Sequence, residues 1–192
     1  MAEHSAAKPL SVDAATGLLA GARQVFSPHL DERPDGATLD LIVLHGISLP
    51  PGEFGGPWID RLFTGDLPLD AHPYFRTVAN GRVSAHVVIR RTGEIVQYVP
   101  FSRRAWHAGV SSYQGRAACN DFSVGIELEG TDETPYTDAQ YEELARLIRA
   151  LLRAYPTLSR DRIAGHSDVA PGRKTDPGPA FDWERLRRLL VA

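Results

Sequence analysis

Cysteine and lysine are scarce in this sequence, and long apolar runs are missing. The 192 residues include a single cysteine, Cys119, which excludes an internal disulfide and a zinc cluster built from thiolates. No stretch approaches the roughly 20 apolar residues that span a bilayer, and the first residues lack the basic region and apolar core of a signal peptide. A metal site would therefore have to use histidines and carboxylates, and we expect a cytoplasmic protein.

Positive charge is too sparse and too dispersed to mark a polyanion-binding surface. The chain has 21 basic and 24 acidic residues, for a formal net charge of −3. No run of basic residues offers a surface for a phosphate backbone or anionic lipids. Only Lys8 and Lys174 are lysines among the basic residues. We expect no nucleic acid or membrane partner, and no protein partner is evident.

Hydrophobic patterning predicts interleaved strands and helices. Strands are expected at 39–46, 83–91, 94–100 and 122–130, and helices at 57–63, 137–155 and 183–191. Interleaving of this kind favours an α/β fold, with a mixed central sheet of about five strands and helices packed on it in a single domain. Residues 1–26 are expected to be a lead-in, irregular or with a short helix, before a domain over 27–192.

Two histidines and an aspartate form a candidate metal site. His45 closes the apolar strand at 39–46, at the position where α/β sheets present functional groups. His166 and Asp176 lie in one loop rich in proline and glycine. Two imidazoles and one carboxylate leave an open coordination position, as in hydrolytic zinc sites. The alternative makes His45 a packed core residue and Asp176 the cap of a turn before Pro177.

Two further residues suit chemistry beside such a metal. In the strand at 122–130 the apolar residues, beginning at Phe122, alternate onto one face and leave Glu127 on the other as a candidate general base. Lys174 lies two residues before Asp176, and an ammonium group near a metal suits a developing negative charge. A solvated outer face for Glu127 and a chance lysine are the alternatives.

Two segments are candidates for the walls of a substrate groove. Residues 103–116 combine Trp106 and His107 with glycines and hydroxyls, which suits a sugar or a peptide. Packing of the loop by its own tryptophan is the alternative, and the role of His107 stays open. Residues 46–73 are rich in proline and glycine around one short helix, and we expect them to form a mobile cover over the groove.

Long blocks of the sequence resemble AmpD-type 1,6-anhydro-N-acetylmuramyl-L-alanine amidases. Among them are RVSAHVVIRRTGEIVQYVPF, RAWHAGVSSYQGR, CNDFSVGIELEGTD and GHSDVAPGRKTDPGPAFDW, and the resemblance runs from about Ser27 to Trp183. It implies the zinc amidase fold shared with peptidoglycan recognition proteins and phage lysozyme-type amidases, with 27–192 as the amidase domain. The implied reaction is hydrolysis of the lactyl amide between anhydromuramic acid and L-alanine in recycled cell-wall fragments, so that an anhydromuropeptide is the substrate and Zn²⁺ the cofactor.

The resemblance also implies roles for individual residues. The zinc ligands it implies are His45, His166 and Asp176. Glu127 matches the catalytic glutamate that takes a proton from the attacking water, and Lys174 matches the lysine that stabilises the oxyanion together with zinc. The residues that look like substrate contacts are Tyr74, Arg82, Ala105, Trp106 and Arg116. The arginines suit the carboxylates of a stem peptide and the tryptophan suits a sugar ring; surface ion pairs and core packing are the alternatives.

Two other functions fit the same fold. One is a non-catalytic module that holds muropeptides without cleaving them, and the retained metal ligands with Glu127 and Lys174 argue against it because a binder needs no such set. The other is an amidase acting on intact peptidoglycan outside the cytoplasm. The lack of a visible signal peptide argues against that alternative.

Overall fold

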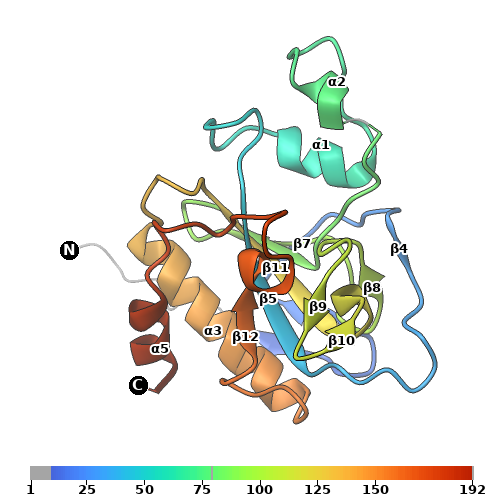
Figure 1. The fold of residues 1–192 in the computed structure, drawn as a ribbon, viewed down its shortest axis with the longest axis vertical. Helices are drawn as coiled ribbons and strands as arrows, with labels where there is room; N and C mark the ends of the chain where they lie inside the picture. Colours follow the sequence, from blue (N-terminus) through green and yellow to red (C-terminus); the bar gives the residue numbers. More distant parts are fainter. Residues whose placement is uncertain (1–9, 79, 192) are drawn as a thin grey trace.

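A six-stranded mixed sheet runs through the centre of the computed structural model, which describes residues 10–78 and 80–191. The strand order is β12-β5-β11-β6-β7-β3 (Figure 1). These strands are β3 (Arg23–Gln24), β5 (Leu41–Ile47), β6 (Val87–Ile89), β7 (Ile95–Gln97), β11 (Ser123–Glu129) and β12 (Ile163–Gly165). The predicted α/β architecture is confirmed, with six strands in place of about five.

Most neighbouring strands of the sheet run parallel. The pairs β12–β5, β5–β11, β11–β6 and β3–β7 are parallel, while β6 and β7 form an antiparallel hairpin. Gly93 lies in the hairpin turn with φ +88°, a left-handed conformation that glycine adopts without strain. Because β5, β11 and β12 are adjacent and parallel, their carboxyl ends meet at one edge of the sheet.

Five α-helices and several short strands complete the part of the chain that the structure describes. The helices are α1 (Trp58–Thr64), α2 (Phe75–Val78), α3 (Asp138–Ala154), α4 (His166–Val169) and α5 (Trp183–Val191), with a 3₁₀ helix at Cys119–Asp121. Three strand pairs lie outside the main sheet: β1 (Ser11–Val12) with β2 (Leu19–Ala20), β4 (Leu30–Asp31) with β8 (Arg104–Ala105), and β9 (Ser112–Tyr113) with β10 (Arg116–Ala117). The three predicted helices form where the periodicity placed them.

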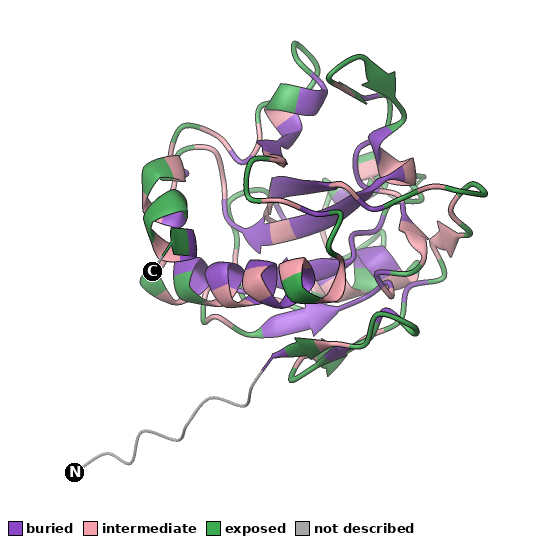
Figure 2. Cartoon of the chain, turned by 90° about the horizontal axis from the view of Figure 1, so that it is seen from below, coloured by how far each residue is buried: buried purple, intermediate pink, exposed green. Residues whose placement is uncertain are grey.

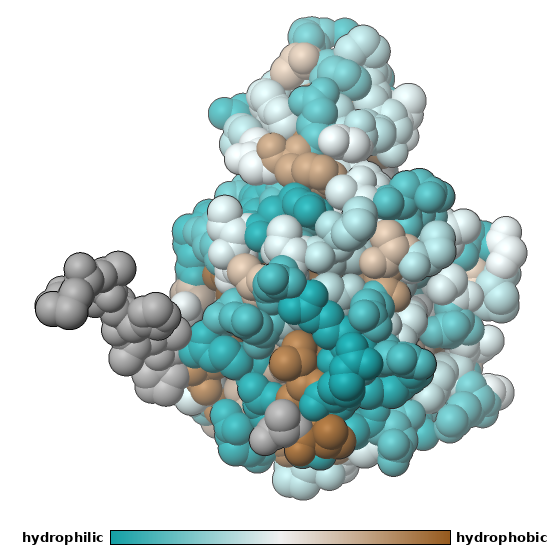
Figure 3. Space-filling view, turned by 90° about the vertical axis from the view of Figure 1, so that its left-hand side faces the viewer, coloured by the Kyte–Doolittle hydropathy of each residue, from teal (hydrophilic) through white to brown (hydrophobic). Residues whose placement is uncertain are grey.

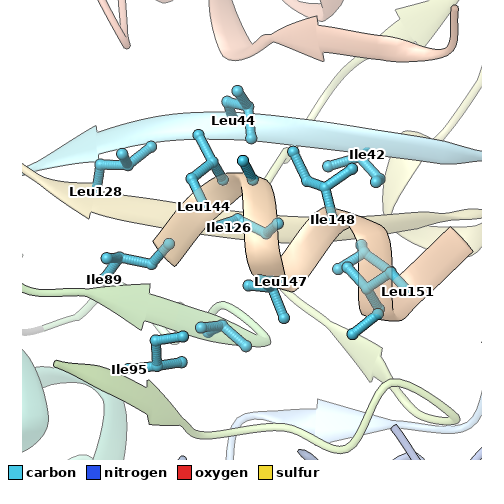
Figure 4. Close-up of a cluster of buried hydrophobic side chains, with 14 of the residues drawn as sticks. Ile42, Leu44, Ile89, Ile95, Ile126, Leu128, Leu144, Leu147, Ile148 and Leu151 are labelled. Carbon is cyan, nitrogen blue, oxygen red and sulfur yellow. The ribbon is translucent and has the colours of Figure 1, made fainter. Parts of the chain in front are cut away.

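Helix α3 covers one face of the sheet. Thr137 caps it, since its hydroxyl accepts from the N–H of Gln140 at 3.2 Å while the Gln140 side chain accepts from the N–H of Thr137 at 3.0 Å, as the predicted capping box requires. Its apolar side packs on the even-numbered residues of β5 and β11 (Figure 4). The labelled side chains of this core are Ile42, Leu44, Ile89, Ile95, Ile126, Leu128, Leu144, Leu147, Ile148 and Leu151.

The opposite face of the sheet carries a second set of buried groups, and the central strands are coloured as buried in Figure 2. Leu41 and Val43 pack there with Phe122. The prediction that Phe122 shares a face with the later apolar residues of β11 is therefore wrong. Phe122 follows the 3₁₀ helix with φ −129° and ψ +12°, which is not extended backbone, so the alternation of faces begins only at Ser123.

The N-terminal segment contains short strands, and the helix considered for it is absent from residues 10–26. The side chain of Gln97 holds the segment: its Oε1 accepts from the N–H of Leu19 at 2.8 Å and its Nε2 donates to the carbonyl of Gly17 at 2.8 Å. Strand β3 then joins the edge of the main sheet beside β7. Part of the lead-in thus completes the sheet.

The segment with α1 and α2 stands out from the sheet as a lobe (Figures 1 and 3). Ile59 and Phe63 of α1 are each 1 % exposed and pack in a cluster with Val88 and Val96 of the sheet. No helix among residues 10–78 and 80–191 is long and apolar enough to cross a membrane.

Candidate active site and metal centre

The three predicted metal ligands meet at the carboxyl edge of the parallel strands. Gly165 of β12 pairs with Leu44 of β5, so the residues that follow them, His166 and His45, lie at the same level. Nδ1 of His45 lies 2.9 Å from Nδ1 of His166 and 3.3 Å from Oδ2 of Asp176. Nδ1 of His166 lies 3.0 Å from the same carboxylate oxygen. The three side-chain atoms that could bind a metal therefore converge on one point.

The hydrogen bonds of His166 show that this point suits a cation. Nε2 of His166 lies 3.3 Å from the carbonyl oxygen of Ala108, which can only accept, so Nε2 carries the proton. On a neutral ring, Nδ1 then has a lone pair that faces the Asp176 carboxylate and Nδ1 of His45. Such groups repel one another unless a cation lies between them. The cluster is compatible with a metal ion on this ground.

The charge state of His45 also fits a metal ligand. Its side chain is 1 % exposed, and burial lowers its pKa to about 4. The imidazole is therefore neutral near pH 7, which leaves a lone pair for metal binding.

Glu127 faces the metal cluster from the neighbouring strand. It is the direct partner of His45 in the parallel register of β11 and β5, and its Oε1 lies 4.0 Å from Nδ1 of His45. Its Oε2 is buried and has no hydrogen-bond partner. Burial, reinforced by the charge of Asp176, raises the pKa of the Glu127 carboxyl well above its ordinary value. The side chain is 12 % exposed, so the alternative of a solvated outer face is wrong.

A cavity of about 690 Å³ lies between the lobe and this edge of the sheet. Of the predicted functional residues, its lining includes Tyr74, Trp106, Glu127, His166, Lys174 and Asp176. Leu49, Leu62 and Phe63 line it from the segment expected to cover the groove. That segment does form a wall of the cavity, and its mobility stays a prediction.

Three predicted substrate contacts lie outside this lining. Arg82 lines an adjoining cavity of about 360 Å³. Ala105 is fully buried in β8. Arg116 in β10 packs its guanidinium over the ring of Phe122 at 3.8 Å and lies 3.3 Å from a carboxylate oxygen of Asp40. Their roles toward a substrate stay predictions.

His107, whose role the sequence leaves open, lies against the metal cluster. The side chain is buried, and its Nδ1 lies 2.9 Å from Nε2 of His45. One signal for it is Gly125, which shares a face of β11 with Glu127. A Cβ at Gly125 would lie 2.4 Å from the ring of His107, so only glycine leaves space for that ring.

Known proteins similar in sequence to this chain include N-acetylmuramoyl-L-alanine amidases. The family model described as N-acetylmuramoyl-L-alanine amidase (Amidase_2) matches residues 35–179. The 1,6-anhydro-N-acetylmuramyl-L-alanine amidase AmpD of Escherichia coli strain K12 is 66 % identical over 174 residues, which cover 91 % of this chain and 94 % of that protein. The AmpD protein of Haemophilus influenzae is 54 % identical over 173 residues, covering 90 % of this chain and 94 % of that protein.

Solved structures of amidases are also similar to this chain. A crystal structure of a selenomethionine derivative of AmpD matches with a TM-score of 0.90 and 63 % identity, covering 93 % of this chain and 98 % of that chain. The amidase AmiD from E. coli, in complex with anhydro-N-acetylmuramic acid-L-Ala-D-gamma-Glu-L-Lys, matches with a TM-score of 0.58 and 26 % identity, covering 95 % and 66 %. From the family match and these relatives, we conclude that the chain belongs to the N-acetylmuramoyl-L-alanine amidase family.

Proposed function

We propose that this protein hydrolyses the lactyl amide between 1,6-anhydro-N-acetylmuramic acid and L-alanine in muropeptides released during cell-wall recycling. One observation carries the proposal: His45, His166 and Asp176 converge beside the unpartnered Glu127 carboxylate oxygen in a cavity of about 690 Å³. The names of the AmpD relatives, and the anhydromuropeptide bound in the AmiD complex, support this choice of substrate.

The metal in the proposal is zinc, held by His45, His166 and Asp176, because two imidazoles and a carboxylate form the donor set of hydrolytic zinc sites. A zinc ion bound there supplies Lewis-acid chemistry that activates a water molecule and polarises the scissile carbonyl. Glu127 takes the proton of the attacking water and returns it to the leaving amide nitrogen. Its raised pKa, which burial causes, brings the carboxyl closer to neutral pH, as a group that both accepts and donates a proton requires.

Residues along the cavity supply charge and contact for the substrate. The ammonium group of Lys174 stabilises the negative charge on the carbonyl oxygen as the water adds. Trp106 and Tyr74 line the same cavity and offer aromatic faces to the sugar. Arg82, in the adjoining cavity, suits a carboxylate of the stem peptide. The roles of Ala105 and Arg116 rest on the resemblance alone.

Mass spectrometry of the products tests the reaction and the substrate. Zinc-loaded protein is incubated with anhydromuramyl-tripeptide and, in a parallel sample, with intact peptidoglycan. We expect anhydromuramic acid and free tripeptide from the first, loss of the products on chelation, and recovery on zinc addition. Binding without cleavage would make the protein a muropeptide-binding module, and equally fast release from intact peptidoglycan would make it a wall-degrading amidase. Cell fractionation tests the expected cytoplasmic location.

A further inference from the structure

A chain of hydrogen bonds leads from the backbone at Cys119 to the metal cluster. The hydroxyl of Ser123 lies 2.6 Å from the carbonyl oxygen of Cys119, which only accepts, so the hydroxyl proton is used there. Oγ of Ser123 lies 3.1 Å from Nε2 of His107 and must accept the proton of that nitrogen. On a neutral ring, Nδ1 of His107 is then a bare acceptor, 2.9 Å from Nε2 of His45.

This order of donors leaves one tautomer for a neutral His45. Its Nε2 gives the proton to His107, so its Nδ1 has the lone pair. Nδ1 is also the atom that lies 2.9 Å from Nδ1 of His166 and 3.3 Å from Oδ2 of Asp176. The carbonyl of Ala108 fixes the tautomer of His166 in the same way. His107 and Ala108, which are adjacent in the chain, therefore orient both imidazoles of the cluster.

Packing holds the His107 ring in place. The ring meets that of His45 edge to face, with 5.0 Å between centroids, and that of His86 with 5.8 Å between centroids. It lies directly against the backbone of Gly125. Its own backbone N–H donates to Oδ1 of Asn120 at 3.2 Å. A ring confined on these sides has little freedom to rotate away from His45.

We propose that His107 is a positioning residue that fixes the tautomer and orientation of His45 and thereby strengthens metal binding. The inference rests on the proposed metal site. Metal-bound histidines usually donate their second N–H to a carboxylate, a backbone carbonyl or water. Here a neutral imidazole is the acceptor, so the outer partner adds no negative charge to a cluster whose own acid is Asp176.

Two substitutions of His107 separate hydrogen bonding from packing. His107→Phe keeps the ring volume and removes the acceptor, while His107→Asn places an amide oxygen close to the position of Nδ1. We expect zinc affinity, measured by competition with a chelator, to fall about 10–100-fold in His107→Phe and to recover largely in His107→Asn. Ser123→Ala frees the Nε2 proton of His107 and should give a smaller loss. Thermal unfolding of each variant reports whether it is folded.

Nitrogen-15 NMR of the imidazoles tests the tautomer without any metal. In the metal-free wild type we expect His45 and His107 each to be protonated at Nε2 and bare at Nδ1, and in His107→Phe we expect a mixture of His45 tautomers. A wild-type His45 protonated at Nδ1 would overturn the inference. So would undiminished zinc affinity in folded His107→Phe, or equal losses in the Phe and Asn variants. If His107→Phe does not fold, the wild-type spectrum and the zinc affinity of Ser123→Ala test the inference instead. A wild type that shows the expected tautomers but binds no zinc would refute the proposed metal site instead.

Discussion

Replacing Glu129 with alanine tests how the lobe is held over the cavity. The Glu129 side chain is 2 % exposed, and its carboxylate accepts from the N–H of Gly55 at 2.7 Å, the N–H of Arg91 at 3.1 Å and the guanidinium of Arg90 at 3.2 Å. Removing one partner of a buried ion pair costs about 3–5 kcal/mol. Because Arg90 keeps a second carboxylate, that of Asp60 at 2.6 Å, we expect the lower end of that range, about 3 kcal/mol.

Differential scanning calorimetry measures this loss. At about 2–4 °C per kcal/mol for a chain of this size, Glu129→Ala should lower the Tm by about 6–12 °C. Glu184→Ala is the matched control, because Glu184 is 82 % exposed and lies 3.8 Å from Arg188; its effect should stay within about 0.5 kcal/mol. A Tm for Glu129→Ala as close to wild type as that of the control would refute the reasoning.

Two further predictions concern stability. Burial lowers the pKa of His86 to about 3, below about 6.5 for an unfolded chain. The folded state therefore binds fewer protons, and stability is lost as pH falls from 6.5 toward 3, by up to about 1.4 kcal/mol per pH unit. His86→Asn, which retains an acceptor for the N–H of Gly125, should lose less stability between pH 7 and pH 5 in urea titrations, and an unchanged loss would contradict this. Gly178→Ala should cost about 1–3 kcal/mol, because Gly178 has φ +80° and a Cβ there would lie 2.3 Å from Cα of Asp132. Gly172→Ala, with φ +76° and open space, should cost less, and equal costs in urea unfolding would count against the steric argument.

Elements with strong local signals could be predicted from the sequence. Helix α3 has its capping box at Thr137 and an apolar stripe along its length, and both are properties of neighbouring residues. Strand β11 alternates between apolar residues and Ser123, Gly125 and Glu127, which set its two faces from the strand period alone. The burial of its second face could not be deduced in this way, since it depends on the segments that pack there.

Short elements made by distant pairing could not be predicted. Strand β3 has two exposed residues, Arg23 and Gln24, so no periodicity marks it as a sheet edge. Strand β12 is three residues long in a segment rich in proline and glycine, and only its pairing with β5 defines it. Added to the four strands that the sequence places, β3 and β12 bring the sheet to six strands, where about five were expected.

The candidate site also contains residues that could be predicted from the sequence and residues that could not. His45 could be named from its place at a strand end, and His166 and Asp176 from their shared loop, while the family resemblance implied all three. His107 could not be assigned, because its role depends on a contact with a residue 62 positions away. For Arg116 the resemblance implies a substrate contact, whereas the structure places its guanidinium against the ring of Phe122 and the carboxylate of Asp40. These neighbours result from tertiary packing, which the sequence pattern does not show.

Single-turnover cleavage by Glu127→Gln tests the central claim most directly. The rate of anhydromuramyl-tripeptide hydrolysis is measured for zinc-loaded wild type and variant, with the zinc content of both determined in the same samples. The account predicts equal zinc content, because Glu127 is not a ligand, and a rate lower by about 10²–10⁴ in the variant, because the amide cannot accept the proton. Equal rates at equal zinc content would contradict the claim that the carboxylate facing the cluster is the general base.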